Sequence, residues 1–224
     1  MIELHTFSIA AHCRQEGSFG VAVSTARPNV GSLVPFVSLK GAIATQARVN
    51  PDLGRQGLAL LEAGVGIEVA LSALLEADPD RAIRQVHGVD AEHTFAFTGS
   101  DCVAWAGQYV GDGFTVAGNM LVGPQVIEAM AEAFVAAPGT ELSERLLRAL
   151  QAGQQAGGDK RGRQSAALLV ASPDPHWYHN LRVDDHPDPV NELRRIYNQV
   201  VEHELKVERQ YGPESVRLFR RIKW

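Results

Sequence analysis

The residues from 157 to 165 combine glycines, charges and polar groups in a pattern that could bind an anion. The cations Lys160, Arg161 and Arg163 and the carboxylate of Asp159 stand within five positions, directly before an apolar run. Arginine forks and main-chain N–H groups in such a loop can bind a carboxylate or a phosphate. The spacing differs from that of a Walker phosphate loop, and an exposed charged turn is the alternative. We expect a substrate-binding loop whose contributing residues are Asp159, Arg161, Arg163, Gln164 and Ser165.

A second group of ligand-type side chains follows at 183–189, where Asp184, Asp185, His186 and Asp188 lie close together in the sequence. Carboxylate and imidazole groups in such a cluster can bind a divalent cation. Neighbouring side chains on an extended backbone point to opposite sides, so Asp184 and Asp185 are poorly placed to share one metal. We therefore favour turn and helix-capping roles here and expect no metal site.

Asn119 lies in the glycine-containing segment 118–121 and is a candidate oxyanion donor, since an amide in such a turn can donate to a developing negative charge. Capping the helix that begins near Pro124 is an equally good interpretation. Cys102 is a weaker candidate nucleophile because no histidine partner is indicated. The two cysteines, Cys13 and Cys102, fit small buried residues in a reducing compartment.

Strands and helices must position these groups, and they come in blocks along the chain. Short β-prone runs predict strands at 6–11, 19–24, 42–47, 83–89, 93–98, 114–117, 165–171 and 180–183. Apolar residues at three- and four-residue steps predict one helix pair over 53–77, split by Gly64 and Gly66, and a second pair over 126–150. A last amphipathic helix is expected to open at Asp188-Pro189.

Strands in groups and helices in pairs predict an α+β fold rather than a parallel doubly wound sheet. We expect a four-layer αββα sandwich, with two stacked, mostly antiparallel sheets flanked by helical hairpins; a two-layer α+β fold explains the order almost as well. The expected main domain spans 1–187. Residues 188–224 are expected to form a helical tail that docks on the body or on a neighbouring subunit, with a basic end at Arg217, Arg220, Arg221 and Lys223.

The composition of the 224 residues excludes several classes of protein. With 45% hydrophobic residues the chain can bury a core, and 21 basic against 26 acidic residues give a net charge of −5. This charge argues against general binding to nucleic acid or to an anionic membrane. The N-terminal residues lack the features of a signal peptide, and no apolar run approaches the ~20 residues of a membrane span. We expect a cytoplasmic protein.

Several longer motifs in the sequence are similar to motifs of a known protein family. They are the segments 6–9, 44–47, 49–51 with Gly54 and 57–58, 105–107, 118–121, 158–168 and 181–187. On these motifs the chain resembles the bacterial DUF1028 family, uncharacterised proteins grouped with the N-terminal-nucleophile (Ntn) hydrolases. The resemblance covers about residues 5–197 and implies the αββα sandwich, which agrees with the element order.

In Ntn enzymes the first residue of the first strand attacks an amide carbonyl, and its own α-amino group is the general base. Family members commonly begin Met-Thr-Phe-Ser, so the resemblance implies that Thr6 is the nucleophile, if it is exposed. Five residues precede Thr6 here, so removal of Met1 alone cannot free its amine. A misassigned start, later cleavage and a use of the fold without Ntn chemistry all stay open.

Three functional hypotheses follow. The first is an Ntn-type amidohydrolase for a small amide, with Thr6 as nucleophile, Asn119 as oxyanion donor, and Ser24 and Lys40 tuning the amine; Arg161 or Arg163 would anchor the substrate. The second is a non-catalytic binding or assembly protein that recognises an anionic ligand through the 158–165 loop. The third, a metal-dependent hydrolase using residues 184–186, is disfavoured. We expect no cofactor, a small-molecule amide or anionic ligand as partner, and a homo-oligomer.

Overall fold

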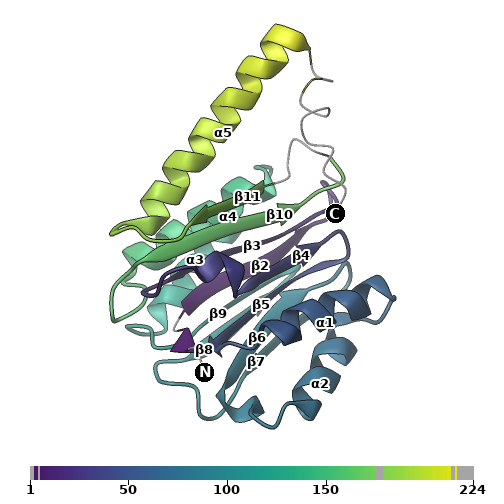
Figure 1. The fold of residues 1–224 in the computed structure, drawn as a ribbon, viewed down its shortest axis with the longest axis vertical. Helices are drawn as coiled ribbons and strands as arrows, with labels where there is room; N and C mark the ends of the chain where they lie inside the picture. Colours follow the sequence, from purple (N-terminus) through teal and green to yellow (C-terminus); the bar gives the residue numbers. More distant parts are fainter. Residues whose placement is uncertain (1–2, 5, 175–178, 213–214, 216–224) are drawn as a thin grey trace.

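The computed structural model describes residues 3–4, 6–174, 179–212 and 215, and within this part of the chain the fold is a mixed α+β structure with two antiparallel sheets (Figure 1). The first sheet has six strands. Their order across the sheet is β11 (His179–Val183), β10 (Ser165–Ala171), β3 (Ser18–Thr25), β2 (Thr6–Cys13), β9 (Phe114–Gly118) and β8 (Gly107–Gly111). The strand that begins at Thr6 therefore lies in the interior of the sheet, between β3 and β9.

The second sheet has five strands, and its order is β1 (Glu3–Leu4), β5 (Gly41–Arg48), β6 (Arg84–Val89) and β7 (Thr94–Thr98), with β4 (Pro35–Ser38) also paired to β5. Both β1 and β4 lie on the edge of β5 that faces away from β6. The strand β4 covers the beginning of β5, from Gly41 to Ala44, and β1 covers its end at Ala47 and Arg48. The edge of β5 is thus shared by two short strands.

One helix pair covers the outer face of each sheet (Figure 1). Helices α3 (Gln125–Val135) and α4 (Leu142–Gln155) pack on the six-stranded sheet. Helices α1 (Pro51–Glu62) and α2 (Ile67–Ala77) pack on the five-stranded sheet, where α1 ends before Gly64 at φ 86°, a backbone angle that suits glycine. The 3₁₀ turns η1 (Val30–Ser32) and η2 (Arg81–Ile83) complete the connections.

Alternation along β2 shows how the two faces of its sheet are used. Phe7 and Ile9 are fully buried in the cluster that contains the apolar residues of α3 and α4. Ala10 instead belongs to a cluster between the sheets, together with Val21, Ala44 and others. Because successive side chains of a strand point to opposite faces, Thr6 and Ser8 share the inner face with Ala10. The chemistry-bearing residues of β2 thus face the other sheet.

Every strand and helix expected from the sequence forms within a few residues of its predicted limits. Three strands were not expected: β1, β4 and β8. β8 is an exposed edge strand bounded by Gly107 and Gly111, and β4 contains Pro35, so neither carries a strong strand pattern. The α+β class and the two antiparallel sheets are confirmed.

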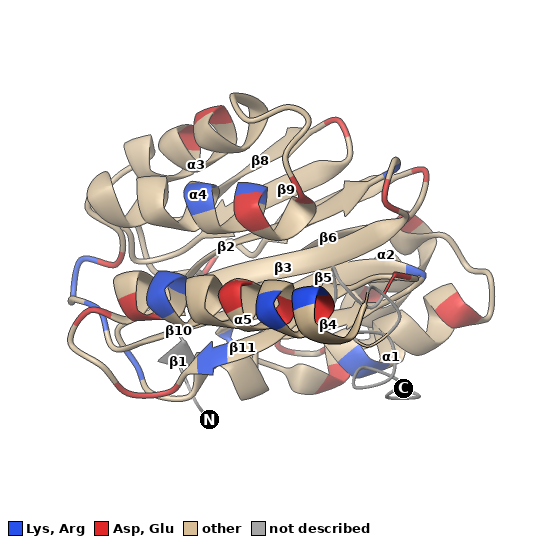
Figure 2. Cartoon of the chain, turned by 90° about the horizontal axis from the view of Figure 1, so that it is seen from above, with Lys and Arg blue, Asp and Glu red and all other residues tan. Residues whose placement is uncertain are grey.

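The tail expected from residue 188 begins with the long helix α5 (Pro189–Tyr211). Its first half buries Val190, Leu193 and Tyr197 against the core that includes β10 and β11, and Arg194 forms an ion pair with Glu144 of α4. Acidic and basic residues alternate along the helix (Figure 2). The basic end at 217–223 lies outside the described residues. No helix among the described residues is both long and apolar enough to cross a bilayer.

Candidate functional site

Thr6 is the first residue of β2 and is completely buried. Its side-chain oxygen Oγ1 has no hydrogen-bond partner among the described residues. Its carbonyl oxygen accepts a hydrogen bond of 3.0 Å from the backbone N–H of Asn119, which directly follows β9. The structure therefore brings together Thr6 and Asn119, two residues that the sequence singled out separately.

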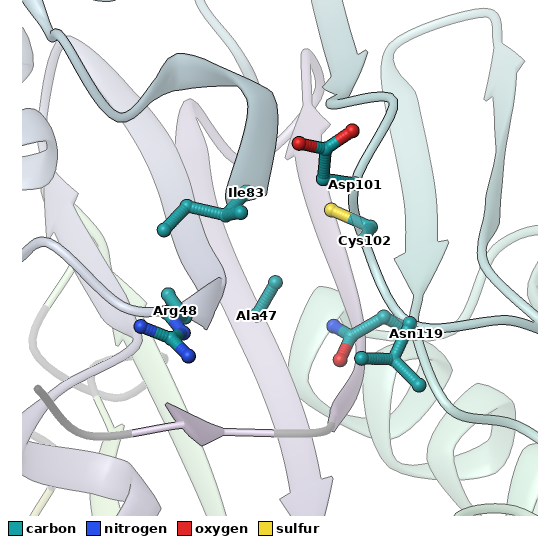
Figure 3. A pocket seen from close by; sticks show the side chains of 7 residues that line it. Ala47, Arg48, Ile83, Asp101, Cys102 and Asn119 are labelled. Atoms are coloured by element: carbon teal, nitrogen blue, oxygen red, sulfur yellow. The ribbon is translucent and has the colours of Figure 1, made fainter.

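A pocket of about 110 Å³ lies at the same ends of the strands (Figure 3). Its lining comes from the end of β5, from η2, from the loop after β7 and from the residue after β9; the residues are Ala47, Arg48, Ile83, Asp101, Cys102, Val103 and Asn119. The short strand β1 runs alongside, since it pairs with Ala47 and Arg48 (Figure 3). The pocket therefore combines charged, amide, thiol and aliphatic groups next to the strand that precedes Thr6.

Two non-glycine residues near Thr6 adopt the left-handed backbone region. Ala47 has φ 67° in the pocket wall, and Met120 has φ 53° directly after Asn119. Left-handed backbone is unfavourable for side-chain-bearing residues and occurs often at functional sites. Strain of this kind at two positions supports a functional role for this end of the sheets.

A chain of buried amides links the two sheets behind the pocket. Gln85 of β6 donates from Nε2 to the carbonyl oxygens of Gly107 and Gly118 at 3.1 and 3.0 Å, and these carbonyls can only accept. Its Oε1 therefore faces Gln46 Nε2 at 2.8 Å and Asn119 Nδ2 at 3.0 Å. This arrangement fixes which end of the Asn119 amide points toward Gln85.

The same reasoning fixes a second part of the network, around His87. Gln46 presents its Oε1 to Ser8, whose hydroxyl donates to it at 2.7 Å. The hydroxyl proton is then used, so His87 Nε2 donates to Ser8 Oγ at 2.7 Å, and His87 Nδ1 accepts from Thr115 Oγ1 at 2.9 Å. Ser8 and His87 lie within hydrogen-bond distance, but in this tautomer His87 is not a base for Ser8. Burial lowers the pKa of His87 from 6.5 to about 3, which keeps the imidazole neutral.

The 158–165 loop lies against the same region through its main chain. Asp159 forms a β-bridge with Leu121, and its buried carboxylate accepts hydrogen bonds from the backbone N–H groups of Ala26 and Arg161. The Arg161 guanidinium contacts the same carboxylate at 2.7 Å. These bonds hold the loop against the residues that follow Asn119. They also pair Arg161, which was expected to anchor the substrate, with a carboxylate of the chain itself.

The other expected loop residues also make contacts within the chain. Arg163 pairs with Asp188 at 3.1 Å, and Gln164 Nε2 donates to Asp185 at 3.0 Å. Ser165 Oγ donates to the carbonyl of Arg27. The loop residues Gln164 and Ser165 thus join the loop to the end of β3 and to the segment after β11.

The group at 184–186 forms no shared ligand set in the structure. Asp184 pairs with Arg182, Asp185 accepts from Gln164, and His186 Nδ1 accepts from the backbone N–H of Asp188. Among the described residues there is no cluster of three or more histidine, cysteine, aspartate or glutamate side chains that could hold a metal ion. These contacts fit loop roles. Asp188 directly precedes α5, but its side chain makes no capping hydrogen bond.

The side chains of the two candidate tuning residues do not face Thr6, contrary to the expectation from the sequence. Ser24 directly opposes Phe7 across the strands and donates to the carbonyl of Ser165, so its side chain lies on the helix-covered face, opposite to the face of Thr6. Lys40 lies in the turn before Gly41, at the opposite end of β5 from Ala47, roughly 20 Å away along the strand. Both residues were expected near Thr6 because they follow it closely along the chain. The direction of β5 carries Lys40 to the far end of that strand, and the alternation of side chains turns Ser24 to the other face of its sheet.

Cys102 forms part of the pocket wall and its thiol contacts the carbonyl of Arg84 at 3.3 Å. Burial raises the pKa of this thiol, which disfavours the thiolate and hence a nucleophilic role. The residues that sequence reasoning missed are Ser8, Gln46, Gln85 and His87. One signal was present in the sequence: Gln85 and His87 stand two residues apart in the expected strand 83–89, so both point to the same face. The structure shows that all six residues of this strand are buried, where polar side chains are normally hydrogen-bonded.

Comparisons with known proteins agree with one another over most of the chain. A model of DUF1028, a family of unknown function, matches residues 6–193, so the match begins at Thr6. The crystal structure of a protein from Silicibacter pomeroyi, described as DUF1028, is 37% identical, with a TM-score of 0.81 over 87% of this chain and 85% of that chain. Sequence and fold therefore lead to the same family.

Two curated proteins match much shorter segments. Protoheme IX farnesyltransferases of Ruegeria pomeroyi and Cereibacter sphaeroides are 33% and 32% identical over 76 and 71 residues. These segments make up 34% and 32% of this chain, and the chain spans only 24% and 23% of the two enzymes' length. Their activity is a property of those proteins.

Proposed function

The chain belongs to the DUF1028 family, a family of unknown function, and from this premise we propose that it is an Ntn-type amidohydrolase with Thr6 as nucleophile. In this proposal the two helix pairs and the two stacked sheets form the four-layer αββα sandwich of Ntn hydrolases. Support comes from the packing of α1 and α2 on one sheet and of α3 and α4 on the other.

The observation that carries the proposal is the environment of Thr6. A buried hydroxyl is normally hydrogen-bonded, because leaving it without a partner costs about 1–3 kcal/mol. Thr6 Oγ1 has no partner among the described residues, and Thr6 lies at the start of the family match. The carbonyl of Thr6 accepts from Asn119, which lines the pocket, while Thr6 itself is buried and is not one of the lining residues. Because the Thr6 hydroxyl makes no hydrogen bond to the part of the chain that the structure describes, we infer that its role is to attack a substrate.

Catalysis in this proposal needs a free α-amino group on Thr6. In the full chain, the nitrogen of Thr6 is an amide bonded to His5 and has no useful basicity. Cleavage of the His5–Thr6 bond would produce an amine with an unperturbed pKa near ~8. That amine would take the proton of Oγ1 while Oγ1 attacks the substrate carbonyl, and would pass the proton to the leaving nitrogen as the C–N bond breaks. Water would then hydrolyse the ester on Thr6.

Asn119 is proposed to stabilise the oxyanion formed in this attack. Its backbone N–H is already bonded to Thr6, so the side-chain amide is the relevant donor group. One N–H of Nδ2 donates to Gln85, which fixes the plane and direction of the amide. A fixed donor needs no reorganisation during the reaction, and removing one such donor typically costs 10²–10³-fold in rate.

The alternative of an anion-binding protein has less support. Arg161 and Arg163, the cations it needs, form ion pairs with Asp159 and Asp188 inside the chain. Binding an anion there would require breaking contacts that also hold the loop in place.

The test compares the full chain with a protein whose first residue is Thr6, produced by cleaving a removable fusion directly before it. We expect hydrolysis of small peptide amides only when the Thr6 amine is free, retention in Thr6→Ser, and a loss of at least 100-fold in Thr6→Ala. Ser18→Ala is the matched control, since Ser18 is a second fully buried hydroxyl at the far end of β3. Equal activity in the full chain, or in Thr6→Ala, would refute the proposal.

A further inference from the structure

The short strand β1 pairs with the edge of β5 directly before Thr6, the residue to which the acyl group of a substrate would be bonded. We propose that the edge of β5 at Ala47 and Arg48 binds the acyl half of a peptide substrate in extended form, as an added antiparallel strand in the place of β1. This inference rests on the proposed function, because it names the substrate class of the same site.

The covalent structure of the chain gives the first argument. The carbonyl carbon of His5 is bonded to the nitrogen of Thr6. In an acyl-enzyme the substrate's carbonyl carbon would be bonded to Oγ1 of the same residue. In a gauche rotamer the nitrogen and Oγ1 of Thr6, to which these two carbons are bonded, are only about 3 Å apart. The acyl chain of a bound substrate would therefore leave Thr6 from almost the same point as the chain that precedes it.

The pairing of β1 gives the second argument. The residue Leu4 lies opposite Ala47, and Glu3 lies opposite Arg48, so an extended segment leading to Thr6 is already held by the backbone of β5. The other strand on this edge, β4, reaches only to Ala44. An edge that is left to a two-residue strand can pair with another extended chain through main-chain hydrogen bonds, whatever its side chains.

The surroundings of this edge are fixed in advance. Arg84 of β6 donates from Nη1 to the carbonyl oxygen of Arg48 at 2.7 Å, and its guanidinium is paired with the buried carboxylate of Asp78 at 2.9 Å. The pocket that Ala47, Arg48 and Asn119 line opens beside it. Alternate residues of an added strand point to opposite faces, so one ligand side chain would reach the pocket while the main chain pairs with β5.

The experiment keeps the full chain and displaces β1 by substitution. Glu3→Pro/Leu4→Pro removes both N–H groups of β1, and Glu3→Ala/Leu4→Ala is the matched control that keeps them. The probe is the synthetic amidated pentapeptide with the sequence of residues 1–5. Its binding is followed by the NMR shifts of the protein's backbone amides. We expect the proline variant to bind the probe at least tenfold more tightly than the control, because in the control β1 competes at a high effective concentration.

The shifted amides should include Ala47, Arg48 and Asn119, and a probe N-methylated at both its glutamate and its leucine should not bind, because one of these two N–H groups faces β5. Absence of binding to the folded proline variant, equal affinity for both variants, or equal binding of the methylated probe would overturn the inference. A protein from which residues 1–5 have been removed gives a second measurement if the proline variant does not fold. If Thr6→Ala still binds the probe and no form of the protein has amidase activity, the proposed catalysis is rejected. The peptide-binding site is then still supported.

Discussion

Replacing His87 should remove a pH dependence of stability that the structure predicts. His87 is fully buried between the sheets and bonds to Ser8 and Thr115. Its pKa is lowered from 6.5 to about 3, chiefly by burial, while a smaller effect of the backbone of Thr115 raises it. The unfolded chain therefore binds a proton below about pH 6.5 that the folded chain refuses until about pH 3.

The sign and size follow from linkage. Where the unfolded state binds one proton more than the folded state, the free energy of unfolding falls by about 1.4 kcal/mol for each unit that the pH decreases. Above about pH 6.5 neither state is protonated at His87 and there is no effect. Between pH 7 and pH 5 a histidine with these two pKa values costs about 2 kcal/mol of stability, which is a large part of the 5–15 kcal/mol of a typical domain.

The assay is urea unfolding at pH 7 and pH 5 for the parent and for His87→Gln. The variant should be less stable at pH 7, because buried hydrogen bonds are lost, but its loss of stability between the two pH values should be smaller than the parent's by about 2 kcal/mol. Ser143→Ala, which removes a buried hydroxyl bonded to Tyr197, is the control that lowers stability without removing an imidazole. An equal loss in parent and variant, or an imidazole that titrates above pH 5 by NMR, would refute the reasoning.

Three further outcomes are expected from urea unfolding. Gln85→Leu should lose at least about 3 kcal/mol, since it leaves two amides and two carbonyls without their buried partner; a loss below about 1 kcal/mol would contradict the network. Asp159→Asn should lose about 2 kcal/mol by breaking the pair with Arg161, and a second change, Arg161→Ala, should add little to it. Gly54→Ala should cost about 1–3 kcal/mol because the new Cβ would lie 2.1 Å from the Phe36 ring; unchanged stability would show that the ring moves freely.

The candidate site illustrates how far sequence reasoning reaches. The resemblance to DUF1028 led to Thr6, and the glycine-containing segment 118–121 led to Asn119; the hydrogen bond between them places both at one end of the sheets. The roles proposed for Ser24 and Lys40 came only from their order along the chain. Alternation turns Ser24 to the other face of its sheet, and strand direction carries Lys40 to the far end of β5.

The charged loop was singled out as a possible anion site, but its contacts in the structure are ion pairs and hydrogen bonds within the chain. Three cations before a strand predict an anion site, but the carboxylate of Asp159 lies within the same loop and bonds to Arg161. Local composition could not show which partner each charge would take, because Asp188, which pairs with Arg163, comes from the start of α5.

The sequence by itself determined the strands, the helices and the α+β class, because hydrophobic periodicity is a local property that each segment carries on its own. It also showed that His5 precedes Thr6, so the α-amino group of Thr6 becomes free only when that peptide bond is absent. Only the tertiary structure decided that Gln46, Gln85 and Asn119 form one buried chain of amides, since the register and the stacking of two sheets bring together residues that lie 34 and 39 positions apart. Only the structure, likewise, placed β1 on the edge of β5, because a two-residue strand has no pattern of its own and forms where a neighbouring edge offers main-chain partners.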